Sequence, residues 1–417
     1  MTGGAQASAS GGEARRTASA GEARGTASGG EARGTAQAEG GVPPAAPLAG
    51  VRVLDLARFP PGAFCTELLA QLGAEVCRVD PPGSDPAMAG IGVGLSRNKK
   101  SVALDLRHPR GSEVLRRLAA WADVLVENNR PGDLDERGFG YRHAAEELPA
   151  LIWCSITGFG QDGPYARWPG HDLTYTAHAG LLAALEPALP WHPQAMLAVP
   201  LGAQMAATGI VAALYERSRT GRGRQVDISL AESATWLLCG AEGAINGTAS
   251  GIPASFDRRL YRCGDGRFVS VAAAEPRTWA ALCTGLGLTD LAGRRPGHDE
   301  AEAVTARLAA AFAERPAAEW VRELGPAGAA VGAVNAGSDL AGDPQVAARG
   351  GLVEVEGVTV PANPIRFRSA AGALAGVPQV PPPAVGADTR PMLAAAGYSP
   401  AEVDELVGEG VVVALRA

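Results

Sequence analysis

Strand-like and helix-like patterns alternate from residue 51 onward, and this alternation restricts the fold more than any other feature. VRVLDLA at residues 51–57 is typical of a buried strand, and a turn and short helix follow it in PPGAFCTELLAQLG. EVCRVDPPG at residues 75–83 predicts a second strand, ended by a Pro-Gly pair. A strand, a helix and a second strand in this order form a βαβ unit. The sequence therefore predicts an α/β protein with a doubly wound sheet.

The alternation continues to residue 157. We expect a strand at 96–106, an amphipathic helix at 109–121, and strands at 122–134 and 151–157. Basic residues gather in the turns beside these strands, at Arg97, Lys99, Lys100 and Arg130. They could hold phosphates at one edge of the sheet, or form a solvated charged rim. Gly62 stands alone after the first strand, so no GxGxxG motif indicates a nicotinamide or flavin dinucleotide site.

A histidine and an aspartate follow the strand at 151–157. The segment WPGHDLTYTAHAG, residues 168–180, places His171 and Asp172 after a glycine and before a helix-like run. An imidazole at the end of a strand is where an α/β protein carries out chemistry. The alternative is that His171 only caps a helix or is a satisfied core group. The residues around it favour neither interpretation.

The overall composition excludes several classes of partner. A net charge of −7 and a pI near 5.5 give no electrostatic reason to expect nucleic acid. The six cysteines lack metal-site spacing and lie mostly in apolar runs, as reduced core residues of a cytoplasmic protein do. The six histidines form no cluster, so we expect no metal. No run approaches the roughly 18 apolar residues of a membrane span.

Four regions are expected along the chain. Residues 1–47 are a Gly-, Ala- and Ser-rich tail with a nine-residue repeat, which we expect to be disordered. Residues 48–245 form the large domain and residues 246–375 a smaller α/β domain, which contains a hairpin about the GDG turn. Residues 376–417 begin in a proline-rich linker and return to the large domain.

Several motifs in a fixed order resemble the family III CoA transferases, which include acyl-CoA transferases and α-methylacyl-CoA racemases. The matching stretches include LAGVRVLDLARFPPG, NKKSVALDL, ADVLVENNRPG, LIWCSITGFGQDGPYA, PGHDLTY, GIVAALYERSRTGRGRQVDISL and GADTRPMLAAAGYSPAEVDEL. The resemblance covers roughly residues 48–410. It implies a Rossmann-like large domain with a smaller inserted domain, and a homodimer whose two chains interlock. The ligand it implies is an acyl-CoA, with coenzyme A near Arg97, Lys99, Lys100 and Arg130.

The resemblance also assigns catalytic residues. In the racemase branch the histidine of PGHD moves a proton at the α-carbon of the thioester, which places that role on His171 beside Asp172. A carboxylate that precedes a proline in the small domain lies near this histidine, and it corresponds to Glu275. Two departures concern the ligand. Pro81 stands where the racemases carry a basic residue, and Asn129 stands where a phenylalanine is usual.

The third group of the family site is missing. An aspartate normally precedes the long helix, as the nucleophile of the transferases or the opposite-face base of the racemases. It should fall at Ala198, or at Val199 with one deletion. Neither residue can attack a thioester or move a proton, and general acid/base assistance contributes roughly 10²–10⁴-fold per group.

Three hypotheses follow from this absence. The first is an isomerase, epimerase or decarboxylase that needs proton transfer on one face, with His171 as acid and base and Glu275 as its orienting partner. The second is a CoA transferase or racemase that uses a substitute group, such as His192 or Glu186. The third is a non-catalytic homologue that binds acyl-CoA.

Overall fold

A computed structural model describes residues 46–185, 195–240, 242–246, 255–369, 372–373 and 376–415. Most of the predicted tail, and both Glu186 and His192, therefore lie outside the described residues.

The largest sheet of the described residues has seven strands, in the order β14-β3-β2-β1-β4-β5-β6. Its strands are β1 (Arg52–Asp55), β2 (Glu75–Asp80), β3 (Lys99–Leu104), β4 (Val124–Glu127), β5 (Ile152–Thr157), β6 (Gln225–Ser229) and β14 (Val412–Val413). The strands from β3 to β6 are parallel, and β14 pairs with β3 in the antiparallel direction. The order 3-2-1-4-5-6 is that of doubly wound dinucleotide-binding sheets, whose ligands bind where the order reverses, between β1 and β4. The predicted α/β class is confirmed.

Alternate side chains along the strands pack into two hydrophobic cores, one on each face of the sheet. Val53 and Val124 lie in the core that includes α1 (Pro60–Gln71), α8 (Ala198–Thr220) and α9 (Leu230–Trp236). Leu54 and Leu125 lie in the other core, with α3 (Gly111–Trp121), α16 (Thr389–Ala395) and α17 (Pro400–Gly408). Neighbouring residues of one strand therefore face different helix layers, as the period of a buried parallel strand requires.

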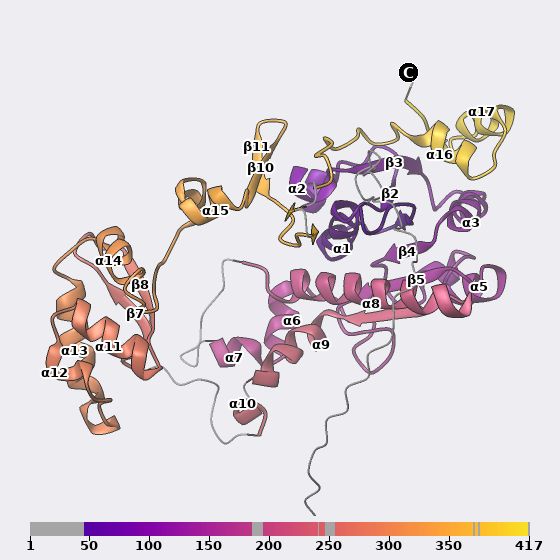
Figure 1. The fold of residues 1–417 in the computed structure, drawn as a ribbon. Helices are drawn as coiled ribbons and strands as arrows, with labels where there is room; N and C mark the ends of the chain where they lie inside the picture. The colour runs from indigo at the N-terminus through magenta and orange to yellow at the C-terminus, as the bar shows by residue number, and fades with distance from the viewer. Residues whose placement is uncertain are drawn as a thin grey trace, which may run out of the picture. The chain divides into compact units, whose positions relative to one another are not determined.

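Helix α8 is the longest described helix, and Figure 1 shows it running beside α6 and α9. By length and composition alone it could cross a membrane. It packs instead against α1, α9, β5 and β6. Gly202 permits the close approach to α9, because a Cβ atom there would lie 2.4 Å from Cδ2 of Leu230. These contacts are those of a core helix.

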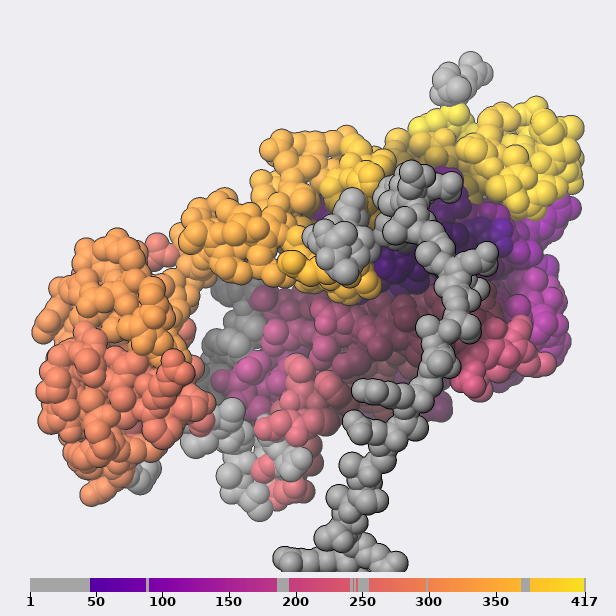
Figure 2. All heavy atoms as spheres, in the orientation of Figure 1, coloured from indigo at the N-terminus to yellow at the C-terminus, as the bar shows by residue number. Residues whose placement is uncertain are grey.

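The carboxyl-terminal residues complete the edge of the same sheet. Asp388 accepts a hydrogen bond from the Ser101 amide of β3, and Thr389 accepts one from the Ala103 amide. Figure 2 shows this segment, in yellow, against the part of the chain coloured indigo and purple. Ser399 caps α17 and Glu402 completes a capping box.

A third hydrophobic core forms around a separate three-stranded sheet, in the order β7-β8-β9. The hairpin predicted about the GDG turn is present, and Gly266 takes a φ of +78° at its tip. Trp279 and Phe312 are the large buried side chains of this core. Its elements are β7 (Arg258–Arg262), β8 (Phe268–Ala272), β9 (Val331–Ala333), α11 (Pro276–Gly285), α12 (Thr289–Ala292), α13 (Ala301–Phe312) and α14 (Ala317–Leu324).

The remaining elements are short. The helices are α2 (Val93–Ser96), α4 (Asp133–Glu136), α5 (Tyr141–Glu147), α6 (Asp172–His178), α7 (Leu181–Leu185), α10 (Glu242–Asn246) and α15 (Pro344–Ala348). The strands are β10 (Leu352–Val355), β11 (Val358–Pro361), β12 (Arg368–Ser369) and β13 (Gly372–Ala373), and 3-10 turns lie at Pro86–Ala89, Leu237–Gly240, His298–Glu300 and Gly337–Gly342.

Candidate active site

The turn that carries His171 is fixed by a tyrosine of the following helix. His171 is the N-cap residue of α6, and its imidazole is exposed. Tyr175 donates a hydrogen bond to the carbonyl oxygen of Gly170 at 2.6 Å. Its ring fills the space beside Gly158 and Gly170, where a Cβ atom would approach Cε1 of Tyr175 to 2.3 Å and 2.6 Å respectively. The glycine before His171 is therefore required by packing, and the packing leaves the imidazole exposed.

Asp172 binds the start of α8. Its carboxylate accepts hydrogen bonds from the backbone N–H groups of Leu197 at 2.9 Å and Val199 at 2.7 Å. These amides have no partner within the helix, and a negative charge at a helix N-terminus also interacts favourably with the helix dipole. Asp172 therefore ties α6 to α8 and holds His171 near the N-terminus of α8.

Ala198 lies between the two amides that Asp172 binds. It is the first residue of α8 and is fully buried, and Val199 is 5% exposed. The positions predicted to correspond to the family aspartate, Ala198 or Val199, thus carry no carboxylate, and the nearby Asp172 carboxylate is held by backbone amides. A charge introduced at Ala198 would be buried against Asp172, which is unfavourable without a paired cation.

Replacing Asp172 with alanine tests this role. We expect a loss of about 0.5–2 kcal/mol in the free energy of unfolding, the usual range for a lost N-cap, measured by urea denaturation. Asp343 offers a matched control, because it accepts hydrogen bonds from Gln345 and Val346 at the start of α15. Both variants should lose stability, but only Asp172→Ala should lower activity in the folded fraction. Equal activity of the two variants would contradict the role of Asp172.

Glu275, the predicted partner of His171, is the N-cap residue of α11 beside the third core. It is exposed, and its carboxylate accepts a hydrogen bond from the Thr278 hydroxyl at 3.1 Å. Among the hydrogen bonds and ion pairs of the described residues, none joins Glu275 to His171. The pairing of these two residues stays a prediction.

A crevice opens at the carboxyl ends of β1 to β4, at the point where the strand order reverses. It has a volume of about 250 Å³, and Arg58, Arg107, Arg137 and Asn129 line it. None of these three arginines forms an ion pair with a carboxylate of the described residues. Pro81 also lines the crevice. Three unpaired guanidinium groups at the switch point of such a sheet are suited to hold phosphates.

The predicted phosphate ligands Lys99 and Lys100 begin β3, so their backbone lies at the opposite edge of the parallel sheet. The Lys99 ammonium is fully buried, 3.2 Å from the Asp55 carboxylate and 2.7 Å from the Thr66 hydroxyl. Lys100 forms a half-exposed ion pair with Glu75 at 2.5 Å. The structure therefore gives both cations carboxylate partners and places them away from the crevice.

The other two predicted cations differ from each other. Arg97 is buried and lies 2.8 Å from Glu67, and it donates a hydrogen bond to the carbonyl oxygen of Pro361. Burial raises the pKa of Glu67 to about 7 although Arg97 acts in the opposite direction. Arg130 follows β4, at the edge formed by the carboxyl ends of the parallel strands, and its side chain is exposed.

Sequence reasoning missed Arg58, Arg107 and Arg137. Arg58 and Arg107 each lie three residues after the end of a strand, β1 and β3 respectively. The signal that could have found them was position after a parallel strand, whereas the prediction relied on the density of basic residues before one.

Comparisons with known proteins agree with this architecture. A family model described as CoA-transferase family III matches residues 48–389. Human alpha-methylacyl-CoA racemase is 33% identical over 88% of this chain and 97% of its own. Mouse succinyl-CoA:glutarate CoA-transferase is 32% identical over 88% of this chain and 90% of its own. A solved structure of a CAIB/BAIF family protein from Brucella suis has a TM-score of 0.74 and 28% identity, and covers 84% of this chain and 100% of that one.

Proposed function

The chain belongs to CoA-transferase family III, and we propose that it is an enzyme that moves a proton on one face of the α-carbon of an acyl-CoA thioester. His171 is the acid and base of this reaction. The proposal rests on the junction of α6 and α8. There the exposed His171 precedes Asp172, whose carboxylate is hydrogen-bonded to backbone amides beside the buried Ala198.

Each alternative reaction of the family requires a group that this junction lacks. Transfer through an acyl anhydride needs a free carboxylate to attack the thioester. Asp172 is a poor candidate, because backbone amides and the start of α8 stabilise its charge. Racemisation by two bases needs a second group that faces His171 across the enolate. Ala198 supplies neither group.

One imidazole is sufficient for the proposed chemistry. Neutral His171 removes the α-proton, and the electrons of the broken C–H bond pass to the thioester oxygen to form an enolate. The imidazolium then returns its proton to the same face of the α-carbon, or to another carbon of a conjugated enolate. Without a second base, no proton arrives from the opposite face.

We assign the CoA phosphates to the three arginines that line the crevice. Replacing Arg107 with glutamine should raise the Kd for CoA about 10-fold to 100-fold, because a hydrogen bond to a charged group contributes about 1.5–3 kcal/mol. The measurement is calorimetric titration with CoA. Lys100→Gln is the matched control and should leave the Kd unchanged, since Lys100 begins β3 at the opposite edge. A larger effect at Lys100 than at Arg107 would place the phosphates at the other edge.

The relatives favour transfer of CoA between acids as the second candidate function. One is named an acetyl-CoA:oxalate CoA-transferase, from Acetobacter aceti, at 32% identity. For this chain, transfer would require a substitute for the missing aspartate. Glu186 and His192 are the candidates. A direct assay with succinyl-CoA and glutarate distinguishes the two functions, and transfer by the unmodified protein would favour this one.

We also propose the interlocked homodimer that the family resemblance implies. Tyr215 of α8 is 67% exposed and Trp236 of α9 is 61% exposed. Large apolar side chains exposed on two neighbouring helices indicate a surface for another chain. Light scattering coupled to size-exclusion chromatography should give about twice the mass of one chain.

A protein that binds CoA but shows no exchange with any thioester would be the non-catalytic homologue.

A further inference from the structure

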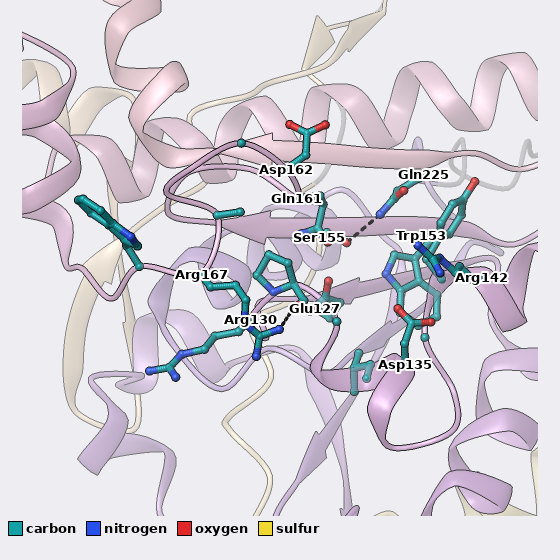
Figure 3. Close-up of a pocket in the computed structure, with 18 of the residues that line it drawn as sticks. Glu127, Arg130, Asp135, Arg142, Trp153, Ser155, Gln161, Asp162, Arg167 and Gln225 are labelled. Atoms are coloured by element: carbon teal, nitrogen blue, oxygen red, sulfur yellow. Dashed lines mark hydrogen bonds between the residues drawn. The ribbon is translucent and has the colours of Figure 1, made fainter.

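A second cavity lies over β4, β5 and β6, apart from the crevice. Its volume is about 670 Å³, and no residue lines both cavities. Trp153 and Gln225 are direct register partners, as are Glu127 and Ser155, so their side chains share one sheet face. Figure 3 shows Glu127 and Ser155 near the middle of the view, and Trp153 and Gln225 on the side of Arg142.

Two arginine side chains lie at opposite sides of this cavity. Figure 3 places Arg130, after β4, on one side and Arg142, of α5, on the other. Neither forms an ion pair with a carboxylate of the described residues. Arg167 also lines the cavity, but it already donates a hydrogen bond to the carbonyl oxygen of Pro131 at 2.6 Å and lies 3.4 Å from Asp133.

The middle of the cavity carries buried polar groups. Glu127 is 5% exposed and accepts a hydrogen bond from the Asn129 amide at 2.7 Å. Burial raises the pKa of Glu127, which favours its neutral, hydrogen-bond-donating form. The buried Nε2 of Gln161 has no hydrogen-bond partner. An unsatisfied buried donor is unfavourable, so a ligand that accepts a hydrogen bond there is stabilised.

We propose that this cavity binds a small free dicarboxylate, with one carboxylate at Arg130, the other at Arg142, and Gln161 as a central donor. Each of the two separated, exposed guanidinium groups can bind one anionic end, and carboxylates match the planar fork of a guanidinium. A monocarboxylate satisfies only one end. Because the two cavities share no lining residue, the dicarboxylate and CoA can bind together. The proposal does not depend on the chemistry proposed for His171.

Calorimetric titration with glutarate tests this site. The unmodified protein should bind glutarate at least 10-fold more tightly than butyrate, and a saturating concentration of CoA should not change the Kd for glutarate. Replacing Arg142 with glutamine should weaken glutarate about 10-fold to 100-fold, because one charge-assisted carboxylate contact is lost. Arg222→Gln is the matched control, since Arg222 is an exposed arginine outside the cavity.

A second variant keeps the proposal testable if Arg142→Gln does not fold. Gln161→Ala removes only the central donor and should also weaken glutarate binding. The proposal is overturned if glutarate does not bind, if butyrate binds equally well, or if the Arg142 and Arg222 variants have the same Kd. Competition between CoA and glutarate would also overturn it, because both ligands would then occupy the crevice. If the unmodified protein binds glutarate but exchanges no α-proton of any acyl-CoA, the result counts against the proposed function alone.

Discussion

Replacing His171 with glutamine is expected to slow exchange of the α-proton of an acyl-CoA by about 10²–10⁴-fold, the range for a general acid/base group. Glutamine retains polarity and approximate size but cannot accept and return a proton at neutral pH. The measurement is deuterium uptake from D₂O, followed by mass spectrometry of the recovered thioester. Affinity for CoA should stay within a few-fold, because the crevice lies at the ends of other strands.

His178 provides the matched control for this experiment. It is also an exposed histidine of α6, and its ring contacts Phe159 and Tyr165 edge-on. His178→Gln should therefore leave exchange close to that of the unmodified protein. If both variants exchange as fast as the unmodified protein, His171 is not the base.

Replacing Lys99 with methionine is expected to lower the free energy of unfolding by about 3–5 kcal/mol, the usual result of removing one partner of a buried ion pair. The variant would leave the fully buried Asp55 carboxylate without its cation, although the Thr66 hydroxyl would remain 2.5 Å away. Urea denaturation measures the change. Lys100→Met is the control, because its ion pair with Glu75 is half exposed and such pairs contribute about 0–1 kcal/mol.

The same two variants separate a structural lysine from a ligand-binding one. In the folded fraction, Lys99→Met should bind CoA as the unmodified protein does, since the ammonium has no exposed surface. A stability loss below 1 kcal/mol together with a large loss of CoA affinity would restore Lys99 as a phosphate ligand.

The strands and the α/β class could be predicted from local patterns, because buried parallel strands are short apolar runs between turns. Sheet order could not be predicted in the same way. Lys99 and Arg107 lie eight residues apart in the sequence, yet Lys99 begins β3 and Arg107 follows its carboxyl end. Which end binds ligand depends on strand direction within the sheet, and local basic density carries no information about that.

The candidate site was only partly predictable. The sequence could locate His171 and predict that the family aspartate is missing at Ala198 or Val199, since both inferences depend on spacing within a motif. The hydrogen bonds from the Leu197 and Val199 amides to Asp172 join residues 25 and 27 positions apart in the sequence. No local sequence pattern predicts these bonds. Nor does any motif report the cavity between Arg130 and Arg142, because three strands and two connecting segments supply its lining.

The stereochemistry of deuterium uptake tests the central claim most directly. A 2-methylacyl-CoA of defined configuration is incubated with the unmodified protein in D₂O, and the deuterated product is resolved into its two epimers. Because a single imidazole removes and returns the proton on one face, the deuterium should appear with retention of configuration. Deuterium in both epimers would require a second base across the enolate, and it would contradict the proposed one-sided chemistry.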